Sequence, residues 1–466
     1  MSLIGALNSA TAGLKLIQSN IEVVSGNVSR SDDPNRTRHS LERTTDGSGT
    51  VTIAQFTRRM DVQLRSQLEG SLSEETGSKT LADFMRRVGD LLGTTAGKPG
   101  LSETVAQFNE AWRDLEATPE SSVAQGQVVL RGDALAREMR RVSAGIEDIS
   151  AAIGREMDQT VDQLNDYLKQ VDAFNDNIAA IRGARQPTAE LEDQRDALVR
   201  KIAEITSVRV VEREAGKIAL FTPSGLSLVD ASPNKLLLQN GNIVSANSGE
   251  SVVGHIRTGK LGALLEIGAD GSKESPPRAA NLTPTAEIVR KLRSQMEQLT
   301  QAFIGPTRPG EPTSFADAYD QAMPVEQGEL RNSFFVGDGA KDITINPALL
   351  TGEVRLKQSA IAATAKSLIE NGRTLAADGV VVTDVSYAGM VSNIMSSWTS
   401  GEADIKARAK AAGEFKDQME SRFHSAVGVN LDEEIADLQV LQRNYSATAR
   451  VMQTVSAMFD ALERIL

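Results

Sequence analysis

The sequence predicts a mainly α-helical fold that carries a small all-β insert. Apolar residues recur every three or four positions over most of the chain, which is the period of an amphipathic helix. Between residues 207 and 255, short β-branched and apolar runs instead alternate with glycine, proline and an Asn-Gly pair. Aromatic residues are only 4% of the 466 residues, so we expect cores built from Leu, Ile, Val and Ala, as in helical bundles.

The two ends of the chain carry matching apolar seams. In residues 1–30 the apolar positions alternate in steps of four and three, the heptad pattern of a coiled coil. In the C-terminal segment, the apolar residues after Asn430 are spaced three or four positions apart but less regularly, and Asn430 itself occupies an N-cap position. Because a seam that faces water needs a partner, we predict that the N- and C-terminal helices pair as a coiled coil. The predicted assembly seam consists of Leu3, Leu7, Leu14, Ile17, Ile21, Val24 and Val28, and of Leu431, Ile435, Leu438, Tyr445, Met452, Phe459 and Leu462.

Pairing of the two ends joins residues that are about as far apart as the chain allows. Such contacts have the highest contact order and form late. We therefore expect the ends to be disordered or loosely paired in a monomer and to become ordered when many copies pack together. An ordinary intramolecular coiled coil in a soluble bundle is the alternative.

The next elements predict a connector and a rod. Ser29 to Arg38 is polar and contains a proline, which is typical of a hinge, and Thr50 to Phe56 alternates like a short strand. From Asp61 the helical period returns. One proline-free apolar stripe then predicts a helix of forty residues, roughly 60 Å long at about 1.5 Å per residue. Gly183 to Pro187 ends this helix, and a second helix through Ile205 returns along it.

After the two antiparallel helices of the rod, the sequence pattern changes from helical to strand-like, which predicts a compact β domain. Nesting of the elements places this domain farthest from the termini, facing outward. Helices resume over 261–267 and 288–303, and a β-hairpin is predicted at 333–347. The remainder is predicted to be helical from Leu356 to Leu375 and from Tyr387 onward. The predicted domains are 1–60 with 425–466 (terminal coiled-coil assembly domain and connector), 61–206 with 256–424 (helical rod domain) and 207–255 (β-rich outer domain).

Composition argues against several function classes. The formal net charge of -12 repels a phosphate backbone, which argues against nucleic-acid binding. The chain has no cysteine, and therefore no disulfide, thiolate metal site or Cys nucleophile. No run approaches the ~18 apolar residues of a membrane-spanning helix. Asn8, Ser9 and Thr11 interrupt the N-terminal apolar run, so we expect neither membrane insertion nor a cleaved signal peptide.

No catalytic, cofactor-binding or metal-binding constellation can be assembled from the sequence. His39, His255 and His424 lie in separate segments without ligand spacing. The acidic cluster from Asp432 to Glu434 is interpreted as the favourable first turn of a helix. Residues 337–341 lack the Gly-Lys-Ser/Thr ending of a phosphate-binding loop and are interpreted as a hairpin turn. We therefore expect a protein that is not an enzyme.

Residues at both ends and in the interior resemble a known family. The terminal signatures of flagellar axial proteins are matched by Gly13, Leu14, Gln18, Ile21, Asn27 and Ser29, by Val429 to Glu434, and by Leu438, Gln442, Tyr445 and Ala447. Five interior blocks, Leu101 to Leu115, Leu191 to Val199, Gly259 to Leu265, Phe334-Phe335 and Ile345 to Leu349, resemble the flagellar hook-associated protein 1 family, the first hook-filament junction protein. The family tends to place Gly-Tyr-x-Arg after its first helix, whereas this chain has Asn35-Arg36-Thr37-Arg38.

The resemblance implies a structural axial protein of the bacterial flagellum that forms the junction layer between hook and filament and is required for filament assembly. Implied partners are copies of the chain in a ring or helical layer, the hook protein, a second junction protein and an export chaperone on the C-terminal helix. It also implies flagellar type III export to an extracellular site. Two alternatives remain: another flagellar rod, hook or junction protein, which would lack the Leu191 to Val199 and Gly259 to Leu265 blocks, and a cytoplasmic coiled-coil scaffold, which would not explain the β insert.

Overall fold

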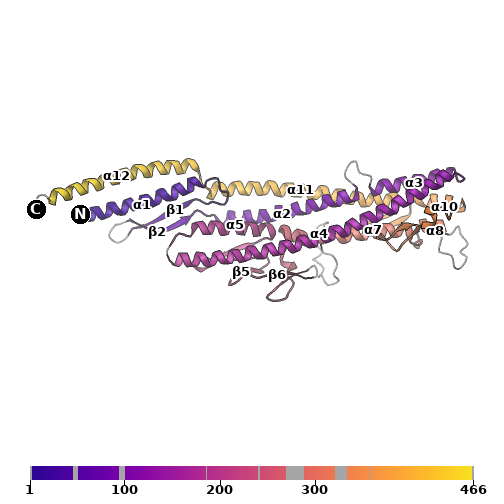
Figure 1. Cartoon of the computed structure of the whole chain (residues 1–466), viewed down its shortest axis with the longest axis horizontal. Helices are drawn as coiled ribbons and strands as arrows, with labels where there is room; N and C mark the ends of the chain where they lie inside the picture. The colour runs from indigo at the N-terminus through magenta and orange to yellow at the C-terminus, as the bar shows by residue number, and fades with distance from the viewer. Residues whose placement is uncertain are drawn as a thin grey trace.

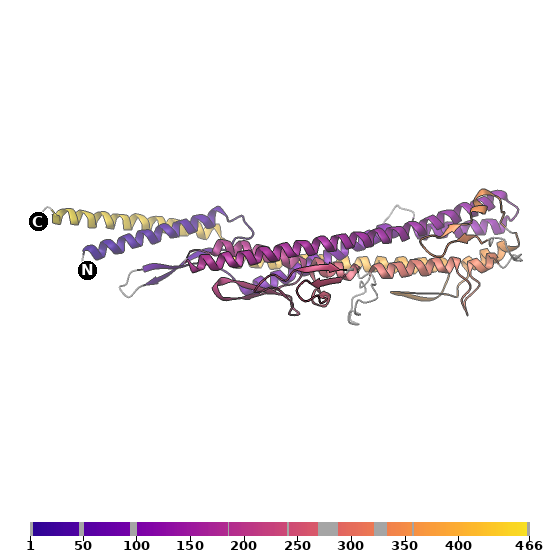
Figure 2. The ribbon, with the colours of Figure 1, turned by 60° about the horizontal axis from the view of Figure 1, so that its bottom comes forward.

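The computed structural model describes residues 3–45, 51–93, 100–184, 186–239, 242–268, 288–320, 333–356 and 358–463. Figures 1 and 2 show an elongated molecule with both termini at one end and the long helices running along its length. The fold class expected from the sequence is confirmed, since helices dominate and the sheets are small and antiparallel.

The terminal helices lie side by side beyond the end of the rod. These are α1 (Leu3–Ser29) and α12 (Leu431–Glu463), and their amino and carboxyl ends project together from the molecule (Figure 1). Two antiparallel strands, β1 (His39–Thr45) and β2 (Val51–Arg58), connect α1 to the rod. The sequence predicts the second strand but misses β1, because its polar residues do not alternate with apolar ones.

The rod is built from long helices that follow the predicted order. Its members are α2 (Val62–Leu92), α3 (Leu101–Ala117), α4 (Ser122–Gly183), α5 (Ala189–Ile205), α6 (Gly259–Gly268), α7 (Ile288–Ile304) and α11 (Tyr387–Val427). Side-chain caps set several starts: Asp61 accepts from the amides of Gln63 and Leu64, and Ser386 accepts from the amide of Gly389. α4 extends farther toward the N-terminus than its predicted stripe, and α11 runs unbroken.

An aromatic cluster closes the end of the rod that lies opposite the termini. Trp112 and Phe108 of α3 contact the rings of Phe315 and Phe334. Gly132 of α4 makes room for this, since a Cβ there would overlap the ring of Phe334. The short elements around the cluster are α8 (Phe315–Asp320), β8 (Phe335–Val336), β9 (Thr344–Ile345), α9 (Pro347–Thr351) and α10 (Gln358–Ile369).

The β insert lies beside the rod, and its predicted position farthest from the termini is wrong. Its strands are β3 (Arg209–Glu212), β4 (Ile218–Phe221), β5 (Ser227–Val229), β6 (Leu236–Gln239) and β7 (Asn242–Ser245), with 3-10 turns at Glu214–Gly216 and Val253–His255. Figures 1 and 2 show the insert along the half of α4 nearer the termini. Two buried asparagines of α4 hold it there: Asn165 exchanges hydrogen bonds with the backbone of Leu236, and Asn175 with that of Ile218. The turn proposed at Asn240-Gly241 lies outside the described residues.

A second hairpin replaces part of a predicted helix. The sequence predicts helix from Leu356 to Leu375, but α10 ends at Ile369 and is followed by β10 (Arg373–Ala377) and β11 (Val380–Val385). Asp378 and Gly379 form the turn, and Gly379 has a positive φ of 81°. Asp-Gly is a strong hairpin signal, which the neighbouring alanines obscure.

Gly259 marks a close helix junction of the rod. It begins α6 with a φ of +76°, a conformation that favours glycine, and a Cβ there would overlap the carbonyl group of Ile205. Gly77 of α2 lies across from it, since a Cβ on Gly77 would come within 3.1 Å of the Gly259 carbonyl oxygen. Three helices therefore meet at backbone distance.

We predict that Gly259→Ala destabilises the rod. The left-handed φ and the overlap with Ile205 should together lower the free energy of unfolding by about 2 kcal/mol or more. Gly254→Ala is the matched control, because its Cβ would meet nothing within 4 Å. Urea unfolding followed by circular dichroism checks this, and equal midpoints for both variants would contradict it.

Candidate assembly interface

The contact between α1 and α12 combines Val24 of the predicted seam with residues that lie beside the seam. Among the described side chains of α1, Ala10, Val24 and Asn27 are buried. Gly13 lies on the same line, where an added Cβ would be 3.8 Å from Cγ2 of Thr448. On α12, Glu434 and Val455 are buried. The two helices are therefore packed closely at Gly13.

The single chain leaves most of the predicted seam partly uncovered. Leu431, Ile435 and Tyr445 are 41%, 45% and 37% exposed. Of the remaining seam residues, Val24 is buried, Leu7, Leu14, Ile17, Ile21, Val28, Leu438 and Met452 are half-buried, and the side chains of Leu3, Phe459 and Leu462 lie outside the described part of the chain. Apolar surface that stays exposed along a helix pair is typical of an interaction surface.

A buried polar group joins α12 to α1 and the connector. Glu434, whose side chain is 1% exposed, accepts hydrogen bonds from Nδ2 of Asn27 at 3.0 Å and from Nε of Arg38 at 2.6 Å. Arg38 also pairs with Asp437 at 3.0 Å. Asn430 caps α12, accepting from the amides of Asp432 and Glu433. The acidic cluster thus fits its helix-capping interpretation, and Glu434 also serves the joint.

Asp193 of α5 joins the connector to the rod. Its carboxylate accepts from the amide and Oγ1 of Thr37 at 3.2 and 2.7 Å, and lies 2.9 Å from Nε2 of His39. Arg58 of β2 donates to it at 3.0 Å. Burial would raise the pKa of Asp193, but the hydrogen bonds from His39 and Thr37 and the charge of Arg58 together lower it.

Arg58 is itself surrounded by three carboxylates of α5. It lies 2.9 Å from Glu192 and 2.8 Å from Asp196, in addition to Asp193. Burial lowers the pKa of Arg58, and these carboxylates more than offset that effect, so its pKa is raised. All three acids come from the block Leu191 to Val199, which the sequence singles out only by resemblance.

The altered motif Asn35-Arg36-Thr37-Arg38 lies at the centre of this joint. Thr37 and Arg38 contact α5 and α12 respectively, and Arg38 is the residue shared with the family pattern. Arg36, at the position of the family tyrosine, is 9% exposed and pairs with Glu190 of α5. We name the group Asn27, Arg36, Thr37, Arg38, His39, Arg58, Glu190, Glu192, Asp193, Asp196, Glu434 and Asp437 the joint.

The joint carries most of the attachment of the terminal pair to the rod. Among the described residues, the elements that α1 contacts most are α12, β1 and β2, and α12 contacts chiefly α1. A small apolar cluster of Leu68, Met419, Phe423 and Val427 supports the joint from the side of α2 and α11. The orientation of the helix pair therefore depends mainly on ion pairs and hydrogen bonds.

A further carboxyl group is buried behind the joint. Glu69 of α2 is 2% exposed, lies 3.8 Å from Arg65, and has Oε1 without a hydrogen-bond partner among the described residues. Burial raises the pKa of Glu69 to about 8, against the opposing charge of Arg65. The folded chain therefore holds a proton here that the unfolded chain releases at neutral pH.

We predict that Glu69→Gln stabilises the chain above neutral pH. Because the pKa of Glu69 is higher in the folded state, the contribution of its protonated form to the free energy of unfolding is fully present at pH values below the ordinary glutamate pKa. This contribution is lost as the pH rises toward 8. At pH 8.5 the free energy of unfolding of the variant should exceed that of the native chain by at least about 1.4 kcal/mol, the equivalent of one pKa unit. At pH 4 the two free energies should agree. Urea titrations across pH measure this. The exposed Glu110→Gln is the control, and a pH-independent difference would contradict the assignment.

We predict that Asp193→Ala loosens the joint. The change leaves Arg58 buried with one carboxylate fewer and removes the hydrogen-bond acceptor of Thr37 and His39. It should therefore lower the free energy of unfolding by about 3 kcal/mol or more. Asp83→Ala, which breaks an exposed pair with Arg86, should cost less than about 0.5 kcal/mol. Chemical unfolding gives both values. Similar small losses would show that the joint is not a strong attachment.

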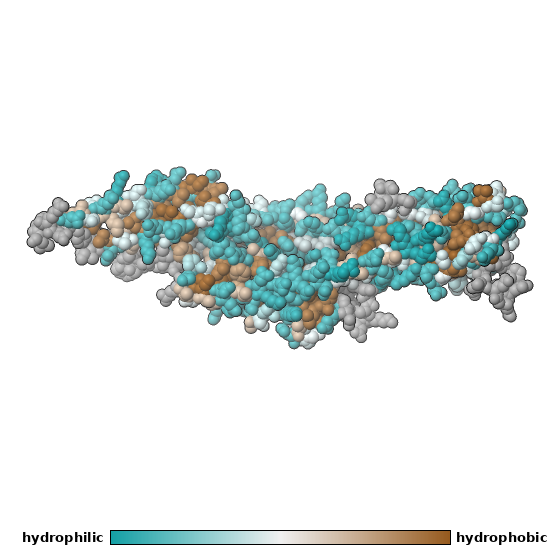
Figure 3. Space-filling view, in the orientation of Figure 1, coloured by the Kyte–Doolittle hydropathy of each residue, from teal (hydrophilic) through white to brown (hydrophobic). Residues whose placement is uncertain are grey.

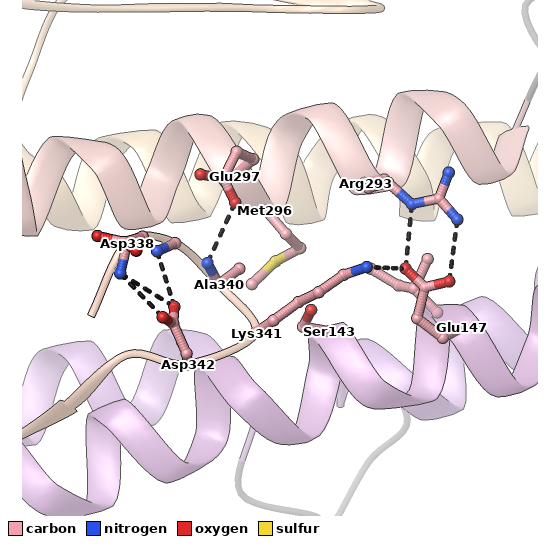
Figure 4. A pocket seen from close by; sticks show the side chains of 11 residues that line it. Ser143, Glu147, Arg293, Met296, Glu297, Asp338, Ala340, Lys341 and Asp342 are labelled. Carbon is pink, nitrogen blue, oxygen red and sulfur yellow. Dashed lines mark hydrogen bonds and ion pairs between the residues drawn. The ribbon is translucent and has the colours of Figure 1, made fainter. Parts of the chain in front are cut away.

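The turn at residues 337–342 binds carboxylates of its own chain. It borders a cleft of about 490 Å³ between α4 and α7 (Figure 4). Asp342 accepts from the amides of Asp338 and Gly339, and Glu297 accepts from the amide of Ala340. The amides that would cradle a phosphate are thus occupied, which agrees with the hairpin interpretation. In the described ranges no cluster of three or more acidic or histidine side chains is placed to hold a metal ion.

Comparisons with known proteins match two parts of the chain to flagellar families. Residues 85–305 match the family described as "Flagellar hook-associated protein FlgK helical domain", and residues 421–465 match "Flagellar basal body rod FlgEFG protein C-terminal". Flagellar hook-associated protein 1 of Salmonella typhimurium is 23% identical over 98% of this chain and 99% of its own length. The protein of the same name from Escherichia coli is 22% identical over 98% of this chain and 99% of its own length.

A solved structure is also similar. The flagellar hook junction protein FlgK from Burkholderia pseudomallei matches 55% of this chain and 43% of its own, with 18% identity and a TM-score of 0.41. No helix in the described part of the chain is long and apolar enough to cross a membrane.

Proposed function

Since the chain belongs to the flagellar hook-associated protein 1 family, we propose that its paired terminal helices build it into the junction layer between the hook and the filament of the bacterial flagellum. The likeness to hook-associated protein 1 over nearly the full length of both proteins carries this proposal. A hook or rod protein is less favoured, because residues 85–305 match the helical domain of FlgK.

The terminal helices would make the contacts between copies. Seam residues that remain exposed in one chain, such as Leu431, Ile435 and Tyr445, would be covered by neighbours in a ring or helical layer. The hook protein on one side and a second junction protein on the other are the proposed axial partners. The joint would then fix the direction of each rod relative to the layer.

The route to that position would be the flagellar type III export apparatus, without a cleaved signal peptide, and the final site would be extracellular. The apolar surface of α12 needs cover before assembly, so an export chaperone is proposed to bind it. We propose a structural role without enzymatic activity, cofactor, nucleic acid or membrane insertion.

We predict that deletion of Leu431–Leu466 abolishes assembly and leaves the rod folded. α12 packs chiefly on α1, so the rod core should keep its thermal transition within a few degrees. In cells whose only copy carries the deletion, hooks should form and filament protein should appear unpolymerised in the medium. The full-length chain in the same cells is the control. Normal filaments on the truncated chain would contradict the proposal.

A further inference from the structure

α12 carries a second apolar line that the predicted seam does not include. Val440, Ala447, Val451 and Met458 are all exposed, and Val440, Val451 and Met458 are 45%, 53% and 51% exposed. At about 100° per residue these four positions lie within roughly 40° of one another, so they form a straight stripe along the helix. We call this set the outer stripe. Figure 3 shows hydrophobic residues gathered over the part of α1 and α12 near the joint.

The outer stripe lies on a different face of α12 from the contact with α1. The buried positions Glu434 and Val455, and Thr448 opposite Gly13, are separated from the midline of the stripe by roughly 60 to 120° around the helix. A second helix can therefore occupy the outer stripe while α1 keeps its place.

α1 has an apolar edge that is also incompletely covered. Leu7, Leu14, Ile21 and Val28 recur every seven residues and remain half-buried, while the contact with α12 runs through Ala10, Gly13 and Asn27. Lys15 and Glu22 are the charged residues of α1, so its surface imposes little charge repulsion on a neighbour. We call Leu7, Leu14, Ile21 and Val28 the α1 edge.

The outer stripe and the α1 edge lie at the same levels along the helix pair. Gly13 lies opposite Thr448, and Asn27 is hydrogen-bonded to Glu434. The step from Gly13 to Asn27 has the same length as the step from Glu434 to Thr448, so the two antiparallel helices stay in one alignment between these pairs. By this antiparallel alignment, Ala447 is level with Leu14 and Val440 is level with Ile21. Two copies placed side by side at one height therefore have the outer stripe of one at the level of the α1 edge of the other.

We propose that the outer stripe of one chain packs against the α1 edge of a second copy of the chain. This inference rests on the proposed function, because a ring or helical layer needs a contact between two different surfaces of each copy. A stripe packed on the same stripe of another copy would close a pair and stop growth. The matched levels supply the two complementary surfaces.

Disulfide cross-linking tests this contact, because the chain contains no cysteine of its own. Two single variants, Leu14→Cys and Ala447→Cys, are expressed together in cells that lack the native chain, so that any mixed disulfide joins two copies. The matched control replaces Ala447→Cys by Ser446→Cys, an exposed neighbour that points about 100° away. The stripe pair should give about tenfold more cross-linked dimer than the control pair, because disulfides require close and aligned Cβ atoms.

A charged substitution gives an independent readout. Val451→Glu should reduce filament-bearing cells at least tenfold, whereas Gln453→Glu should not, and both purified chains should keep the helical content of the native chain. Equal cross-linking by the Ala447→Cys and Ser446→Cys pairs, or dominant dimers of Ala447→Cys alone, would overturn the contact while leaving the proposed function intact. Failure of the native chain to restore filaments in these cells would overturn the proposed function and the contact with it.

Discussion

The arrangement of the molecule depends on one polar junction, the pairing of Arg58, Thr37 and His39 with Asp193 and of Asn27 and Arg38 with Glu434. The apolar core ends with the rod, and α1 and α12 extend beyond it. Their direction is therefore set by charged groups, of which Arg58, Asp193 and Glu434 are buried. Such groups tolerate few alternative geometries, because each lost partner leaves a charge without compensation. We infer that this polar joint fixes the orientation of the helix pair.

Beyond the joint, the terminal pair is incomplete by itself. Small residues, Ala10 and Gly13, set the approach of α1 to α12, and larger apolar residues on both helices stay partly exposed. A two-helix pair of this kind has little stability of its own, since most helical stability comes from packing. Copies that cover the remaining faces would add that packing only in the assembled layer. Assembly and ordering of the ends would then be a single process.

Periodicity predicts the long helices well, because each buries one apolar face along its length. It fails where a short turn decides the structure: Asp378-Gly379 starts a hairpin inside an alanine-rich stretch that looks helical, and β1 is too polar to be recognised. The position of the β insert was not predictable from element order, since two asparagines on α4 decide it. The joint was also not predictable, because Asp193 and Arg58 are distant in sequence and residues of these types usually lie at the surface. Resemblance pointed to the block that contains Asp193, and only the fold shows its role.

Amide hydrogen exchange along α12 tests the central claim most directly. The account predicts that the amides of residues 440–458 exchange rapidly in the dilute monomer and become strongly protected in the assembled layer, while α4 stays protected in both. Equal and strong protection of α12 in monomer and layer would show that the helix pair is complete within one chain, and would contradict the account.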